Sequence, residues 1–233
     1  MSAASPQRLK APWQQEYDAW KLRRLDDLEV VDCLGRWAVR EKAGLEDSKA
    51  ALLVLVGALT DGRTVVLTVE SGQRESKESW GVVLRDLRAR GLKPWRCTVA
   101  DGHLGIWAAL AEQQPMAAEQ RCWNLKLLNV LDAMPKTHQA EAKALLTAMP
   151  SAETQTECER LRDPCSRRDR GLAPKAVERG HADWERLVTC SRVPRAHWRH
   201  LRTTVGKRYK RIDSATALIW KVWQVAEGRH QPE

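Results

Sequence analysis

Asp101 is the residue whose type and position point most directly to chemistry. It follows a short apolar stretch, residues 94–100 (PWRCTVA), which predicts a β-strand, and it precedes Gly102 and a predicted helix that opens near Ile106. A carboxylate at the C-terminal end of a strand can point into a site that it shares with other elements. The alternative role is that of an Asp-Gly turn residue or a helix N-cap, which is commoner for a single Asp.

Basic residues are concentrated near the C-terminus. The segment 186–212 contains no acidic residue, and its cations are Arg186, Arg192, Arg195, Arg199, Arg202, Lys207, Arg208, Lys210 and Arg211. The whole chain has 39 Lys and Arg against 30 Asp and Glu, a formal charge of +9, which favours a polyanionic partner such as DNA or RNA. A charged run is usually a solvated face, and contacts with phosphate groups are the functional alternative.

Nitrogen and sulfur ligands are too scattered to predict a metal centre. His197 and His200 are three residues apart and can share a helical face, but no carboxylate or Cys lies near them in the sequence, so packing is the expected role. The six cysteines form no C-x-x-C pair, and we expect reduced thiols. No apolar run is long enough to span a membrane and the N-terminus lacks a signal-peptide core, so we expect a cytoplasmic protein.

The hydrophobic pattern predicts an α/β layer followed by helices. Residues 13–29 are predicted to form a polar helix that docks through an aromatic stripe. Two strands are predicted at 51–59 and 64–70, joined by a hairpin turn, and a second helix is predicted at 76–92. The buried stripe of that helix is predicted to consist of Trp80, Val83, Leu84 and Leu87. A last short strand is expected at 119–123. Further helices are expected at 125–133, 135–148, 152–162, 174–189, 194–203 and 213–227.

Three segments of the chain carry a resemblance to a known family. They are RCTVADGHLGIWAALAEQ, then QRCWNLKLLNVLDAMPK, and then HWRHLRTT. Together they closely resemble the catalytic domain of mutator-type bacterial insertion-sequence transposases, and with the earlier segments AGLEDSKAALLVLVGALTDGR and ESGQRESKESWGVVLRDLRARGL the resemblance covers residues 13–227 with interruptions.

The resemblance implies an RNase H-like core with an Asp-Asp-Glu triad and a helical insertion before the Glu. Such a triad holds two divalent cations, expected to be Mg²⁺, for phosphoryl transfer on DNA. Asp101 matches the second Asp of the triad and would be both a catalytic and a metal-binding residue. We therefore expect a degenerate RNase H-like mixed sheet with a C-terminal helical insertion or cap: a helical lead-in (1–29), a catalytic core (30–130) and an α-helical insertion with the C-terminal helix (131–233).

The first Asp of the triad has no counterpart in this sequence. The family carries a stretch resembling V-W-[AV]-D-G-[IL]-Y-V-K on its opening strand, whereas residues 30–42 here read VVDCLGRWAVREK. Gly35 and Arg36 are expected to disrupt that strand. Asp32 lies several positions too early and Glu41 several too late, so recruiting either would need a register change that turns side chains to the other face.

A local shift of reading frame explains this divergence, as a hypothesis. Permitted codons for the residues from Cys33 to Glu41 are TGT CTG GGC CGA TGG GCT GTA CGT GAG. Read from the second base, they spell Val-Trp-Ala-Asp-Gly-Leu-Tyr-Val, which is the missing motif. We expect the coding DNA to show this, and codons that spell no Asp-Gly in any shifted frame would refute it.

Two further family signatures are also incomplete. The third acid should follow HWRHLRTT in a tract resembling N-x-x-E-S, but Thr204 runs directly into Val205 and that tract is absent. Asp213 reads instead as the N-cap of the last helix. A family C-x-x-H pair is reduced to Cys122 with Leu125 in place of the His, which excludes a zinc site built on that pair.

These observations predict a transposase copy that is truncated and catalytically inactive. The family activity is DNA strand cleavage and transfer, but one triad acid remains, and the residues before position 13 are too few for the family's N-terminal DNA-binding region. One alternative is a non-catalytic DNA-binding remnant that self-associates or assembles with intact transposase copies. Another is a decayed reading frame, which the absence of Phe beside 11 Trp also fits.

Overall fold

The computed structural model describes residues 10–39, 51–72, 76–102, 104–152, 154–189 and 220. These residues fall into two compact units. Unit 1 takes its described residues from Met1–Thr98, His103–Ala117 and Arg195–Glu233, and unit 2 consists of Val99–Gly102 and Ala118–Pro194.

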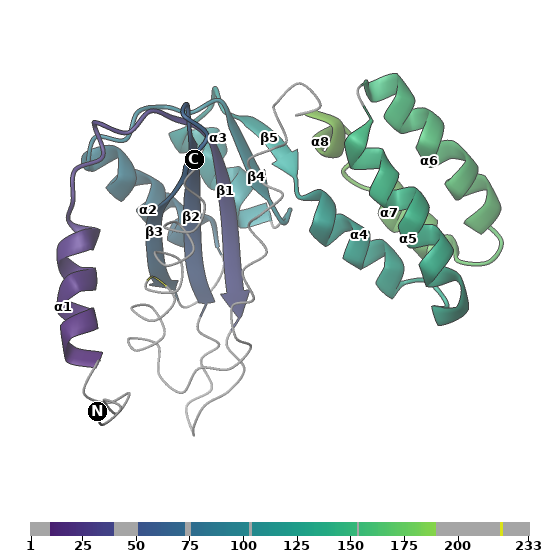
Figure 1. The fold of residues 1–233 in the computed structure, drawn as a ribbon, viewed down its shortest axis with the longest axis horizontal. Helices are drawn as coiled ribbons and strands as arrows, with labels where there is room; N and C mark the ends of the chain where they lie inside the picture. The colour runs from purple at the N-terminus through teal and green to yellow at the C-terminus, as the bar shows by residue number, and fades with distance from the viewer. Residues whose placement is uncertain are drawn as a thin grey trace. The chain divides into compact units, whose positions relative to one another are not determined.

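Five strands form one sheet in the order β3-β2-β1-β4-β5. They are β1 (Val30–Val39), β2 (Ala51–Leu59), β3 (Thr64–Gly72), β4 (Cys97–Ala100) and β5 (Ala118–Arg121) (Figure 1). The first three strands are antiparallel neighbours. The α/β character predicted from the sequence is confirmed.

The predicted hairpin between β2 and β3 is confirmed. Gly62 has φ +88°, a conformation that favours glycine, and Asp61 Oδ1 accepts a hydrogen bond of 2.9 Å from the Arg63 backbone N–H. Strand β2 is an almost continuous run of buried apolar residues, as expected for a strand covered on both faces.

Strand β1 differs from the expectation that Gly35 and Arg36 disrupt it. It continues through both residues in unbroken register with β2, with Gly35 opposite Leu55 and Arg36 opposite Val54. A β-carbon on Gly35 would overlap Ile106 Cδ1. The glycine is therefore accommodated by a side chain that fills its place, and the apolar partner strand supplies the pairing.

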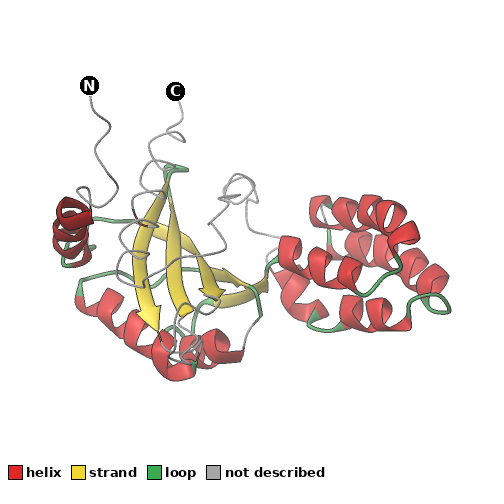
Figure 2. Cartoon of the chain, turned by 90° about the horizontal axis from the view of Figure 1, so that it is seen from below, coloured by secondary structure: helices red, strands yellow, loops and turns green. Residues whose placement is uncertain are grey.

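Two helices cover one face of the sheet in unit 1 (Figures 1 and 2). Helix α2 (Lys77–Ala89) begins at Ser76, whose hydroxyl accepts a 3.2 Å hydrogen bond from the Ser79 N–H, and it buries the predicted stripe of Trp80, Val83, Leu84 and Leu87. It ends in a Schellman motif closed by Gly91 at φ +95°. Helix α3 (Leu104–Gln113) packs beside α2.

Helix α1 (Lys10–Lys21) is shorter than the predicted 13–29 and docks on strand β3, an edge of the sheet. The Tyr17 hydroxyl donates a hydrogen bond to the Val69 carbonyl. Tyr17 and Trp20 also pack against Trp220, with ring centroids 5.9 and 5.5 Å from the Trp220 ring. The predicted docking role of the aromatic stripe is thus confirmed for Tyr17.

Unit 2 is mainly helical. Its helices are α4 (Trp123–Asp132), α5 (Gln139–Ala148), α6 (Gln155–Asp169), α7 (Pro174–His181) and α8 (Trp184–Val188), with short 3₁₀ turns at Lys136–His138 and Met149–Ser151. The single helix predicted at 174–189 is two helices, because Asp183 takes the left-handed conformation at φ 59°. No described helix is long and apolar enough to cross a membrane.

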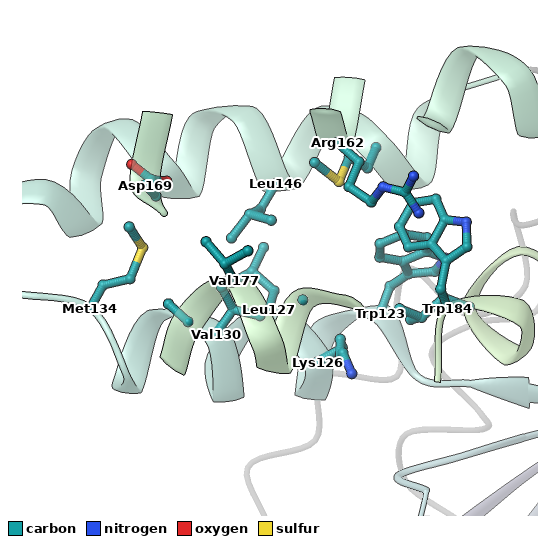
Figure 3. Close-up of a pocket in the computed structure, with 14 residues that line it drawn as sticks. Trp123, Lys126, Leu127, Val130, Met134, Leu146, Arg162, Asp169, Val177 and Trp184 are labelled. Carbon is teal, nitrogen blue, oxygen red and sulfur yellow. The ribbon is translucent and has the colours of Figure 1, made fainter. Parts of the chain in front are cut away.

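An apolar cavity of about 40 Å³ lies within the helices of unit 2 (Figure 3). At one end the Trp123 and Trp184 rings meet edge to face at 6.0 Å, and the Arg162 guanidinium lies 4.3 Å from the Trp184 ring centroid. Its lining is almost entirely hydrocarbon, so the cavity belongs to the core between α4, α6 and α7.

Candidate functional site

Asp101 stands directly after β4, as the sequence predicted. Gly102 follows with φ +90°, so the pair forms a turn that favours glycine at its second position. The Ala100 carbonyl accepts a hydrogen bond of 2.7 Å from the Cys122 backbone N–H, which ties the end of β4 to the end of β5. The Asp101 carboxyl is half-buried.

The guanidinium of Arg121 lies over this turn. A β-carbon on Gly102 would overlap Arg121 Nη1 and Cζ. Arg121 is 8% exposed, and its Nε is buried with no hydrogen-bond partner among the described residues. Sequence reasoning assigned Arg121 no role, although it lies in the R-C-W-x-x-K segment that carries the family resemblance.

Lys126, the last residue of that segment, fastens α4 to the turn between α7 and α8. Its ammonium donates a hydrogen bond to the Ala182 carbonyl and lies 4.0 Å from Asp183 Oδ2. Burial lowers the pKa of Lys126, Asp183 opposes that shift, and the nearby Arg121 cation adds to it. The pairing explains how a non-glycine residue holds the left-handed conformation at position 183.

Arg186 is held inside unit 2 by acidic residues. Its Nε lies 2.7 Å from Glu119 Oε2 and its Nη1 lies 3.8 Å from Asp183 Oδ1. Because the segment 186–212 contains no acidic residue, the sequence did not predict these two partners. The other eight cations proposed for DNA contact, and His197 and His200, lie outside the described residues.

Asp32 is the only described residue among the acids considered as substitutes for the missing triad acids. Asp32 is buried on β1, and both of its oxygens lie 3.4 Å from the Arg96 guanidinium, so it forms a structural ion pair. Glu41, Asp213 and the tract after Thr204 lie outside the described residues.

The cysteines do not form a metal site within the described residues. Cys122 is the N-cap of α4 and makes no side-chain capping bond, while Cys33 is a buried free thiol whose pKa is raised by burial. Cys97 is disulfide-bonded, which differs from the expectation that all the thiols are reduced.

The residues brought together at Asp101 do not fit a divalent cation. Mg²⁺ requires several oxygen ligands, whereas the turn after β4 offers one carboxylate and has the Arg121 guanidinium packed against Gly102. Among the residues that the structure describes, no three His, Cys, Asp or Glu side chains gather closely enough to hold a metal ion.

Comparison with known proteins identifies the lineage. The family model for "Transposase, Mutator family" matches residues 2–212. The chain belongs to the Mutator family of transposases. It is 39% identical over 205 residues to the transposase for insertion sequence element IST2 of Acidithiobacillus ferrooxidans, and 37% identical over 207 residues to that for IS6120 of Mycolicibacterium smegmatis.

The matches cover most of this Mutator-family chain but only part of its relatives. Each of these two matches spans 88% of the chain, against 69% of the first relative and 63% of the second. The transposase for ISRM5 of Rhizobium meliloti is 35% identical over 170 residues, which span 71% of the chain and 41% of that relative. The match of the family model to residues 2–212 confirms the family that the sequence predicted.

Proposed function

We propose that this chain descends from a transposase that moves an insertion sequence by metal-dependent phosphoryl transfer, and that this copy retains DNA binding but does not cut DNA. The observation that carries the proposal is the pairing order of the sheet. Strand β1, which should present the first acid, is formed and neighbours β4, which presents Asp101. The acid that β1 carries is Asp32, which is paired with Arg96 rather than placed where the family's first Asp is expected.

The strand order supports an RNase H-like assignment. In the arrangement that the resemblance implies, one acid comes from β1 and the next follows β4. Here the middle of β1 reads Gly35-Arg36-Trp37, and the buried Asp32 is committed to Arg96. Two-metal catalysis needs carboxylates that converge from separate strands to hold both ions, so a single Asp101 leaves the centre incomplete.

Retained DNA binding is supported by charge. The formal charge is +9, and the eight basic residues of segment 192–211 bring no acid with them. Cations of this density bind phosphate groups with little regard to base sequence. A copy that binds DNA without cutting it can also assemble with intact transposase copies, or with itself, and interfere with their activity.

Salt-dependent binding to an arbitrary duplex tests the retained function. If about six phosphates are contacted, the affinity should fall by roughly three orders of magnitude between about 50 and 200 mM salt. The measurement is fluorescence anisotropy with two duplexes of unrelated sequence, which should bind alike. Tight, salt-insensitive binding to only one of the duplexes, or no binding to either at low salt, would contradict the proposal.

A further inference from the structure

We propose that Arg121 is an anion-binding residue that takes a phosphodiester group of DNA beside Gly102, at the end of β4. The inference rests on the proposed function for the identity of the anion. The residues that carry it are Gly102, Arg121, Cys122 and Lys126, all within unit 2.

The first argument is the cost of an unpaired buried cation. Arg121 is more than nine-tenths buried, and its Nε has no hydrogen-bond partner among the described residues. A buried charge is strongly unfavourable unless it is paired. Arg90, which is equally buried, also leaves its Nη1 without a partner, but its Nε donates to Asp86 at 2.9 Å and its Nη2 to the Leu67 carbonyl at 3.2 Å. The Arg121 Nε is therefore a buried donor that an anionic ligand could satisfy.

The second argument is the fit between Arg121 and Gly102. The φ of +90° alone favours glycine, and a β-carbon would in addition occupy the place of the guanidinium. The turn thus leaves room for a cation against the backbone next to Asp101. Stable folding does not need a charge there, because an uncharged side chain of similar length would fill the same space.

The third argument is that the surrounding groups favour an anion. Arg121 directly precedes Cys122, the N-cap of α4, and Cys122 makes no side-chain capping bond. The first N–H groups of a helix attract anions, and they need such partners when the cap residue supplies none. Arg121 is also close enough to Lys126 to lower the pKa of that ammonium, so two cations lie near the start of α4. Guanidinium groups bind phosphate oxygens in a two-pronged geometry, which makes phosphate the fitting anion.

Thermal unfolding with inorganic phosphate tests the site without DNA. The full chain, Arg121→Gln and the charge-matched control Arg63→Gln are compared in phosphate and in chloride of equal ionic strength. Phosphate should raise the midpoint temperature of unfolding of the parent chain and of Arg63→Gln. The midpoint temperature of Arg121→Gln should rise by several degrees less. In chloride, Arg121→Gln should unfold at the same or a higher temperature than the parent, since it removes an unpaired buried charge.

Duplex binding then tests the identity of the anion. Arg121→Gln should weaken binding about tenfold near 100 mM salt and reduce the slope of log affinity against log salt by about 0.9, the value for one phosphate contact. Gly102→Ala should reproduce this weakening with the charge retained, because it displaces the guanidinium. Gly91→Ala is the matched control, since Gly91 has φ +95° but lies away from Arg121, and it should leave binding unchanged.

The outcomes separate the two proposals. If Arg121 has only a structural role, Arg121→Gln will have a lower unfolding temperature than the parent chain in chloride. The stabilisation by phosphate and the salt dependence of duplex binding will then be the same in both proteins, and this result would overturn the inference. Undiminished duplex binding by Arg121→Gln would also overturn it while the proposed function stands. If the parent chain binds no duplex but its phosphate effect depends on Arg121, the anion site is supported as a site for free phosphate and the proposed function fails.

Discussion

At Gly35, the side chain of Ile106 from α3 fills the space that a β-carbon on β1 would take. Glycine normally weakens the interior of a strand, but it is tolerated where another group approaches the backbone closely. A substitution at this residue therefore tests whether β1 is held against α3 as the structure shows.

We expect Gly35→Ala to lower the free energy of unfolding by about 1–3 kcal/mol, the usual cost of overpacking. Ile106→Val alone should cost about 0.5–1.5 kcal/mol, but it removes the Cδ1 atom that the new methyl group would meet. The double variant should thus be less destabilised than the sum of the two single changes, as measured by urea unfolding. Strict additivity would show that the two residues do not meet.

Sequence patterns predicted Asp101 at a strand end, and they could not predict Arg121 as its neighbour. The position of Asp101 follows from local hydrophobicity and the Asp-Gly dipeptide, which are read within a few residues. The approach of Arg121 to Gly102 depends on where β5 begins and ends, which only the assembled sheet decides. The partners of Arg186 were missed for the same reason, since Glu119 lies in a distant part of the sequence.

At the scale of the element, helix α1 and the residues just after it satisfy hydrogen-bonding groups of the sheet edge. Strand β3 ends the sheet, and its carbonyls at Val69 and Val66 accept hydrogen bonds from Tyr17 and Arg23. Side chains that occupy an edge strand protect it from pairing with other chains. The helical spacing of Tyr17 and Trp20 predicted a docking face, but their contact with Trp220 could not be predicted because nothing in either local pattern links the two segments.

We expect Tyr17→Phe to destabilise the chain by about 1 kcal/mol, because the buried Val69 carbonyl loses its donor. Gln15→Ala, on the same helix and exposed, should change the stability by less than about 0.5 kcal/mol. Burial raises the pKa of the Tyr17 hydroxyl. The hydroxyl therefore loses its proton at a lower pH in the unfolded chain than in the folded one. Its contribution to the free energy of unfolding is complete below about pH 10 and declines as the pH rises further.

Unfolding by urea at two pH values tests this assignment. The difference between the parent chain and Tyr17→Phe should shrink from pH 8 to about pH 11, in accord with the raised pKa of Tyr17. A difference that stays constant or grows over this range would show that the hydroxyl is not buried against β3.

At the scale of the whole molecule, the chain forms a five-stranded sheet and a helical unit, and we propose that its catalytic centre is incomplete. The five-stranded sheet and the helices have the α/β character that the hydrophobic pattern predicted. Strand β1 forms although its pattern is broken, because its partner β2 is apolar throughout and its glycine is packed. The pairing of β1 with β2 therefore does not require the family's acidic motif on β1.

Metal-dependent nicking of a supercoiled plasmid is the most direct test of the central claim that this copy binds DNA without cutting it. The parent chain and Asp101→Ala are incubated with Mg²⁺ or Mn²⁺ at a salt concentration where the duplex is bound, with chelator as the control. We predict no nicking above the chelator control for either protein, because one carboxylate cannot hold two cations against their repulsion and hydration. Metal-dependent nicking by the parent chain that Asp101→Ala abolishes would contradict the account and show that another acid completes the site.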